Sequence, residues 1–205
     1  RSSRGNEAGL KYYLMGVFAS AVLLYGMSLL FGATGSTLLT DIGAALADGD
    51  LIGLEVVAVV FVICGFAFKV SAVPFHQWAP DTYEGAPTPV TAFFSVAAKS
   101  AGFVALMTLI FVAFPGADAV YEPLIWVMAA LTMTIGNVLA LRQTNIVRML
   151  AYSSVSQGGF ILMPLAFAGN SDAAGSAMNA VMVYLLVYAF MNLGAFAVVI
   201  AVSRK

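Results

Sequence analysis

The chain has 205 residues, of which 61% are hydrophobic and only 9% are charged, and its mean hydropathy is +0.96. A water-soluble domain of this size could not cover its surface with so few polar side chains, so we predict an integral membrane protein in contact with the lipid bilayer. The formal net charge of -1 gives no electrostatic surface for nucleic acid. The single cysteine, Cys64, excludes an intrachain disulfide and leaves metal and thiol chemistry without support.

Six windows reach the roughly 20 mostly apolar residues that a membrane helix requires. In chain order they are about 11–31, 52–78, 88–114, 122–141, 146–169 and 176–203. The sequence therefore predicts an all-α, polytopic bundle of transmembrane helices that forms a single domain over 1–205. Residues 32–51 are rich in Gly, Thr and Asp and predict an external loop, in which a short surface helix is capped by Thr40 or Asp41.

The charged residues divide between the two membrane faces. Seven of the nine basic residues lie at one face: Arg1, Arg4, Lys11, Arg142, Arg148, Arg204 and Lys205. The opposite loops carry Asp41, Asp48, Asp50, Asp118, Glu122 and Asp172. Positively charged loops normally stay in the cytoplasm, so we expect both ends of the chain to be cytoplasmic. The chain starts without a signal peptide and stops where a helix ends, and we expect a piece of a longer polypeptide.

Lys69 and Lys99 are the two basic residues that this division leaves over. Lys99 lies roughly 15 Å below the end of its span and Lys69 at a similar depth, near the middle of a hydrocarbon core about 30 Å thick. A central lysine costs roughly 2.5–3.5 kcal/mol, so such residues normally face a bundle interior or a hydrated cavity and mark proton or ion pathways. We predict that both amines are buried and relay protons, because burial favours loss of the proton.

The alternative is that each lysine is a structural member of an ion pair. The nearest carboxylate in the span of Lys69 is Glu55, which is roughly 21 Å away along the helix. A partner carboxylate must therefore come from another segment.

The span at 52–78 contains Pro74, five residues after Lys69. Proline lacks a backbone donor and clashes with the preceding turn, so we predict a break near residues 70–74. Broken helices are typical of transporter sites, although a simple kink is the alternative. The only histidine, His76, follows the break and is suited to passing protons between a lysine and bulk water; the alternative is a plain hydrogen-bonding group near the interface.

Further polar residues extend this pattern. Asp81 and Glu84 are candidate proton-collecting acids, although a solvated loop face explains Glu84 as well. Two polar stripes lie on the last two spans: Ser153, Ser156 and Gln157 on one, and Tyr184, Tyr188 and Asn192 on the other. Such stripes usually join helices by hydrogen bonds, and the alternative is that they hold a chain of water molecules.

Two long motifs point to a known family. "FKVSAVPFHQWAPDTYEGAPTPVTAFFSVAAK" and "GNVLALRQTNIVRMLAYSSVSQGGF" closely resemble the antiporter-like membrane subunits of proton-pumping NADH:quinone oxidoreductase, respiratory complex I, and most closely its subunit N. The resemblance implies an inverted-repeat, antiporter-like fold of fourteen helices, of which this chain would hold the sixth to the eleventh. It also implies a bacterial inner membrane, or alternatively an organellar inner membrane.

The resemblance further assigns roles to individual residues. It implies that Lys69 pairs with a glutamate on the family's fifth helix, beyond this chain, that Lys99 is the central relay, and that His76 lies on the polar route. It implies an enzyme subunit with no redox centre, whose partner subunits hold FMN, iron-sulfur clusters, NADH and quinone, so we expect no cofactor and no metal in this chain. The alternatives are a free-standing or Mrp-type cation/proton antiporter subunit and a scaffold whose lysines only hold helices together.

Overall fold

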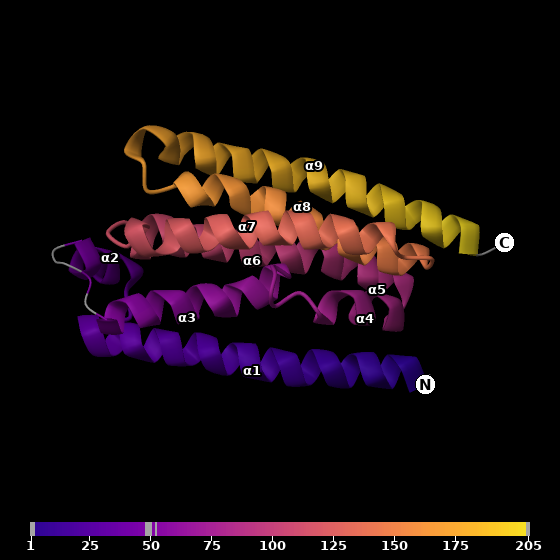
Figure 1. Cartoon of the computed structure of the whole chain (residues 1–205), viewed down its shortest axis with the longest axis horizontal. Helices are drawn as coiled ribbons and strands as arrows, with labels where there is room; N and C mark the ends of the chain where they lie inside the picture. Colours follow the sequence, from indigo (N-terminus) through magenta and orange to yellow (C-terminus); the bar gives the residue numbers. More distant parts are fainter. Residues whose placement is uncertain (1–2, 48–50, 52, 204–205) are drawn as a thin grey trace.

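The computed structural model describes residues 3–47, 51 and 53–203. They form an antiparallel bundle of helices in which the two chain ends lie at the same end of the bundle (Figure 1). Six helical stretches are long and apolar enough to cross a membrane: Gly5–Thr34, Gly53–Val70, Thr88–Ala113, Asp118–Leu141, Ile146–Phe167 and Ser171–Ser203. The predicted membrane-spanning helical bundle is therefore confirmed.

Four of the spans contain a single long helix each, and two short helices lie between spans. The α-helices are α1 (Ser3–Thr34), α2 (Leu39–Ala47), α3 (Gly53–Val70), α4 (Trp78–Gly85), α5 (Thr88–Phe93), α6 (Lys99–Thr108), α7 (Asp118–Leu141), α8 (Ile146–Leu162) and α9 (Ser171–Ser203). Within α-helices every interior backbone group is bonded inside its own segment, which is what the bilayer core requires.

The second span is broken as predicted. α3 ends at Val70, the chain continues without regular helix through residues 71–77, and α4 begins at Trp78. Figure 1 shows α4 as a separate short helix next to α1, displaced from the end of α3 by the irregular segment. Inside the break Ser71 has a positive φ of 59° and the Val73–Pro74 peptide bond is cis.

The third span contains two π-helical segments. One, at Phe94–Ala98, joins α5 to α6 directly before Lys99, and the other, at Leu109–Ala113, follows α6. π-helical turns are rare and occur frequently at functional sites. This span therefore has an irregular backbone immediately beside the lysine that the sequence analysis singled out.

The hydrophobic core lies between α3, α6, α7 and α8, while α1 and α9 flank it (Figure 1). Fully buried side chains at its centre include Ile63, Phe103 and Ile161. α7 and α8 approach closely at Gly136, where an added Cβ would lie 2.7 Å from the backbone nitrogen of Ser156. A small residue at this position lets the two helices pack backbone against backbone.

The short helix after the first span differs from the prediction. α2 starts at Leu39, and Ile42 N donates to Leu38 O, so Thr40 and Asp41 lie inside the helix and the predicted cap is wrong. The Ser36 hydroxyl instead accepts from Leu38 N and donates to Asp41. Ile42 is buried against the core, so α2 is anchored by one apolar face.

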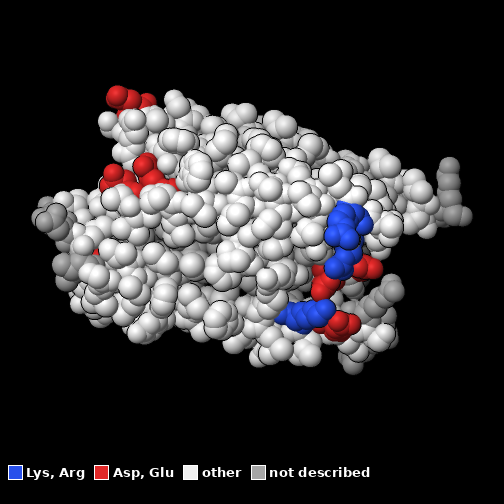
Figure 2. Space-filling model, in the orientation of Figure 1, with Lys and Arg blue, Asp and Glu red and all other residues white. Residues whose placement is uncertain are grey.

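The described charges are distributed unequally along the bundle. On the face drawn in Figure 2, Lys and Arg appear only at the end that holds the chain termini, and the described charged residues at the opposite end are acidic. Several residues used in the charge argument lie outside the described part of the chain: Arg1, Asp48, Asp50, Arg204, Lys205 and the side chain of Arg4.

Candidate functional site

Lys99 is a buried amine in the middle of the bundle. Its side chain is only 2% exposed. Its Nζ donates to the backbone oxygen of Ser154 at 2.6 Å and to the Ser154 hydroxyl at 2.8 Å. Among the described residues no carboxylate lies within ion-pair distance of this ammonium. The predicted burial of Lys99 is thus found, and its partners are neutral oxygens of α8.

A network of hydroxyl and amide groups continues from Ser154. The Ser154 hydroxyl lies 2.7 Å from the Tyr188 hydroxyl and 3.4 Å from the Tyr83 hydroxyl. Tyr188 donates to the backbone oxygen of Ser95 at 3.0 Å, and Asn192 Nδ2 donates to the Ser95 hydroxyl at 2.6 Å. All of these side chains are buried. The network therefore connects α4, the π-helical turn before Lys99, α8 and α9.

A cavity of about 150 Å³ connects Lys99 to Lys69. Its walls are Tyr12 from α1, Phe68 and Lys69 from α3, Trp78 and Tyr83 from α4, and Phe94, Ala98 and Lys99 from the third span. A molecule of liquid water occupies about 30 Å³, so the volume is sufficient for a few water molecules between the two amines. We call this space the lysine cavity.

Lys69 differs from the prediction, because its side chain is exposed in this chain. It occupies the last turn of α3 and also borders a second, more open space of about 270 Å³ against α1. Its Nζ lies 5.9 Å from the centre of the Phe68 ring, and no described carboxylate pairs with it. The predicted burial of Lys69 is therefore wrong within the described chain. The described chain borders this flank with α1 residues such as Tyr12 and Gly16, but the space between them stays open and leaves the side chain exposed.

His76 lies in the irregular segment before α4 and is 9% exposed. Within the described part of the chain, its Nδ1 has no hydrogen-bond partner. The same holds for the buried hydroxyls of Ser71 and Ser156. His76 does not line the lysine cavity. The fold thus brings Lys69 and Lys99 together on one cavity, whereas His76 lies within the break and does not border that cavity.

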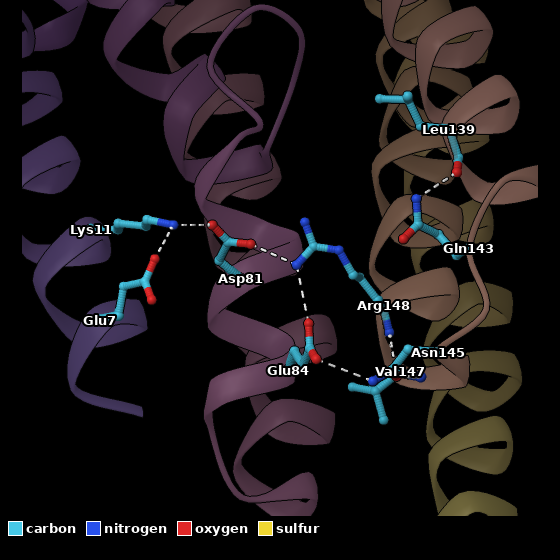
Figure 3. A network of polar contacts seen from close by, with 9 residues as sticks. All are labelled: Glu7, Lys11, Asp81, Glu84, Leu139, Gln143, Asn145, Val147 and Arg148. Carbon is cyan, nitrogen blue, oxygen red and sulfur yellow. Dashed lines mark hydrogen bonds and ion pairs between the residues drawn. The ribbon is translucent and has the colours of Figure 1, made fainter. Parts of the chain in front are cut away.

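A group of charged residues joins α1, α4 and α8 at the end of the bundle that holds the termini (Figure 3). Asp81 on α4 lies between two cations: Lys11 Nζ is 2.9 Å from one carboxylate oxygen and Arg148 Nη1 is 2.6 Å from the other. Burial alone would raise the pKa of Asp81, but the hydrogen bonds from Lys11 and Arg148 outweigh it and hold that pKa below its usual range.

Two further carboxylates complete this group. Arg148 Nη1 is also 3.1 Å from Glu84 Oε2, and Asn145 Nδ2 donates to Glu84 Oε1 at 3.2 Å. Lys11 is also 2.7 Å from Glu7, which lies one turn earlier on α1. Figure 3 shows these side chains as one continuous row from α1 across α4 to α8. We call Lys11, Asp81, Glu84 and Arg148 the charged cluster.

Ser154 contacts Lys99 but does not belong to the polar face that the sequence predicts. The pattern on this span points to the neighbouring Ser153, Ser156 and Gln157. The available signal was the spacing of Ser154 and Gly158, two small residues one turn apart on α8, which leave room for the end of a long side chain from another helix. Tyr184 and Gln157 do contact one another, and their bond lies on the α8–α9 seam.

Comparisons with known proteins agree with this architecture. The whole chain, residues 1–205, matches the family model described as NADH:quinone oxidoreductase/Mrp antiporter, TM. NADH-quinone oxidoreductase subunit N of Trichlorobacter lovleyi is 46% identical over 211 residues, which include 100% of this chain and 41% of that protein. The chain thus spans about two fifths of the length of this curated relative.

Two solved structures show how widely the fold is shared. A chain of respiratory complex I from Thermus thermophilus with bound aureothin has a TM-score of 0.75 and 37% identity, covering 97% of this chain and 41% of that one. A chain of the Mrp complex from Dietzia sp. DQ12-45-1b has a TM-score of 0.83 and 28% identity, covering 96% and 36%. The higher TM-score belongs to the less identical chain, so the backbone fold does not separate the two classes. The chain belongs to the NADH:quinone oxidoreductase/Mrp antiporter transmembrane family.

Proposed function

We propose that this chain is part of a proton-translocating membrane subunit of NADH:quinone oxidoreductase. In this proposal Lys69, Lys99 and His76 relay protons while electrons pass from NADH to quinone in partner subunits, which hold the FMN and the iron-sulfur clusters. The assignment to this class rests on the 46% identity to a subunit N over the whole chain, compared with 28% to the Mrp chain. The membrane is then the bacterial inner membrane, with both ends of the chain cytoplasmic.

The observation that carries the proposal is the surroundings of the Lys99 ammonium. The amine is almost completely buried and meets only hydroxyl and carbonyl oxygens among the described residues. A permanent ion pair would fix the charge of Lys99, whereas neutral oxygens can hold both the protonated and the neutral amine. Lys99 can therefore gain and lose a proton without leaving an unpaired carboxylate in the membrane.

Lys69 supplies the second station of the relay. Both amines line the lysine cavity, whose volume allows a short chain of water molecules to carry a proton between them. The exposed flank of Lys69 faces α1 at membrane depth, where contact with lipid would cost several kcal/mol, roughly 2.5–3.5 on insertion scales. We infer that protein covers Lys69 in the assembled subunit, which makes other membrane subunits or segments its partners.

The proposal is tested by replacing Lys99 with methionine in the complete complex. Met has a similar length and no proton to exchange, so NADH-driven proton movement into inverted membrane vesicles should fall per NADH oxidised. The matched control is Arg142→Gln, which removes an exposed positive charge from the turn between α7 and α8. If the Lys99→Met complex assembles normally and pumps as the wild type does, the relay role is rejected.

Lys69→Arg is the complementary variant. Arginine keeps the positive charge but does not release its proton under physiological conditions. A structural role for Lys69 predicts normal pumping in this variant, and a relay role predicts a loss. Full pumping by Lys69→Arg would show that reversible deprotonation at this position is not required.

A cation/proton antiporter of the Mrp type is the second candidate, because the fold also matches an Mrp chain with a TM-score of 0.83 and does not separate the two classes. The two functions differ in their driving reaction. Sodium-dependent proton movement in vesicles that lack NADH and quinone would assign the antiporter function. Proton movement that requires NADH oxidation would assign the chain to the oxidoreductase.

A further inference from the structure

α4 separates two spaces within the bundle. On one side is the lysine cavity, to which α4 contributes Trp78 and Tyr83. On the other side is an open space of about 250 Å³ at the end of the bundle that holds the termini, lined by Glu7, Ala8, Lys11, Asp81, Glu84, Gly85 and Arg148. α4 thus presents its aromatic side chains to the amines and its carboxylates to the open space. It is the wall between them.

A helix as short as α4 depends on its neighbours for its position. It has only eight residues, follows the irregular segment 71–77 and ends before Pro87, and isolated helices shorter than about 12–15 residues are marginal in water. Its inner face is buried in the core through Trp78, Ala79 and Tyr83, and two side-chain hydrogen bonds fix it further: Trp78 Nε1 donates to Phe68 O at 3.0 Å, and the Tyr83 hydroxyl lies 3.4 Å from that of Ser154.

The outer face of α4 is held by Glu84, through Arg148 and Asn145, and, toward two long helices at once, by Asp81. Its two carboxylate oxygens bind different cations on different long helices, Lys11 on α1 and Arg148 on α8, at 2.9 and 2.6 Å (Figure 3). The side chains of Asp81 and Arg148 are only 26% and 31% exposed, so solvent screens their contact less than that of a fully exposed pair. Charge-assisted hydrogen bonds of this kind are roughly twice as strong as neutral ones.

We propose that Asp81 is a positioning residue that fixes α4 between α1 and α8, so that Trp78 and Tyr83 close the lysine cavity against the charged end of the bundle. The bridge acts as a latch: it determines how easily α4 moves and therefore how easily water reaches the two amines from that end. The consequence for proton transfer rests on the proposed function, whereas the latch itself does not.

A role as a proton collector fits Asp81 less well. The groups that face it are Lys11 from α1 and Arg148 from α8, and Arg148 also contacts Glu84 on α4 itself. Both cations favour the charged carboxylate, and the lowered pKa of Asp81 means that it stays unprotonated at neutral pH. A proton-collecting acid needs a pKa close to the working pH. Asp81 therefore suits a fixed electrostatic tie.

The test compares Asp81→Asn with Glu7→Gln in the complete complex in nanodiscs. Both variants replace one carboxylate by its amide in the same group, but among the described residues Glu7 forms its ion pair with Lys11 on its own helix and none with α4. The measurement is amide hydrogen exchange of residues 82–86, read by mass spectrometry. Because a partly buried charged tie is lost, we expect exchange in Asp81→Asn to accelerate about threefold to tenfold, with no change in Glu7→Gln and recovery in Asp81→Glu.

The outcomes separate the latch from the proposed function. Unchanged exchange in Asp81→Asn, or an equal acceleration in Glu7→Gln, overturns the latch. Normal pumping by Lys99→Met overturns the proposed function and leaves the exchange result standing. If Asp81→Asn fails to assemble, Lys11→Gln is measured in its place, because it removes the cation that ties Asp81 to α1. The latch predicts faster exchange of α4 in this variant, and an unchanged rate rejects it.

Discussion

Tyr188→Phe decides whether the hydroxyl network around Lys99 joins helices or carries protons. The Tyr188 hydroxyl lies 2.7 Å from that of Ser154, donates to Ser95 O at 3.0 Å and accepts from Asn192 Nδ2 at 3.1 Å. Phenylalanine keeps the ring and removes only this oxygen. The substitution therefore tests the hydroxyl without opening a cavity of the size that a truncation would leave.

The expected loss of stability in Tyr188→Phe depends on which hydrogen bonds the former partners of the hydroxyl can still make. Three hydrogen bonds at about 0.5–1.5 kcal/mol each give an upper limit of roughly 4.5 kcal/mol. Ser154 keeps its bond from Lys99, and Asn192 keeps its bond to the Ser95 hydroxyl, so two of the three partners stay satisfied. We therefore expect a destabilisation of about 1–3 kcal/mol, because mainly the buried Ser95 oxygen loses its side-chain donor.

The assay is thermal inactivation of the purified complex together with proton pumping per NADH oxidised. If the network joins helices, Tyr188→Phe loses α9 packing at a lower temperature and pumps normally for every complex that remains assembled. Tyr25→Phe is the control, since Tyr25 is exposed on α1 and has no hydrogen bond among the described residues. Normal heat resistance combined with reduced pumping would refute the reasoning and assign the Tyr188 hydroxyl to proton transfer.

Two further predictions concern helix packing and pH. Gly136→Ala places a Cβ 2.7 Å from the Ser156 backbone nitrogen and should separate α7 from α8 at a cost of about 1–3 kcal/mol, measured as lower assembly yield. Gly194→Ala should be neutral, because among the described residues its Cβ would meet no atom within 4 Å outside its own stretch of helix. The pKa of Asp81 is lowered in the folded chain, so its contribution to stability is complete above the unfolded pKa of about 3.9. That contribution is lost as the pH falls through the lower, folded-state pKa. Exchange of α4, corrected for intrinsic rates, should thus be constant between about pH 5 and 8; loosening near pH 6–7 would indicate a different titrating group.

The transmembrane helices and the break in one of them were predictable from the sequence. Six apolar windows gave six spans because the thickness of the bilayer sets the length of a helix. The break after Lys69 was predictable because Pro74 cannot continue a regular helix. Both predictions depend on local composition alone and need no knowledge of which helices meet.

The details of the site were not predictable, because they depend on how the helices are rotated against one another. No proline or glycine marks the π-helical turn at Phe94–Ala98, yet one extra residue per turn rotates everything after it by about 100°. A regular helical projection from Thr88 therefore places Lys99 on the wrong face. The choice of Ser154 as its partner, and the exposure of Lys69, follow from the same cross-helix geometry.

The interruption of α3 places a partial charge that cannot be titrated inside the bundle. The helix ends at Val70, and the carbonyl end of a helix carries roughly half a negative charge, part of which is met here by Ser71 N and Trp78 Nε1 on the Phe68 oxygen. Lys69 occupies its last turn, and a methyl group at Gly158 would lie 3.3 Å from the Val70 oxygen and 3.7 Å from Lys99 Nζ. A partial negative charge of the peptide backbone thus lies at the end of α3 beside Lys69, and unlike a carboxylate it cannot take up a proton.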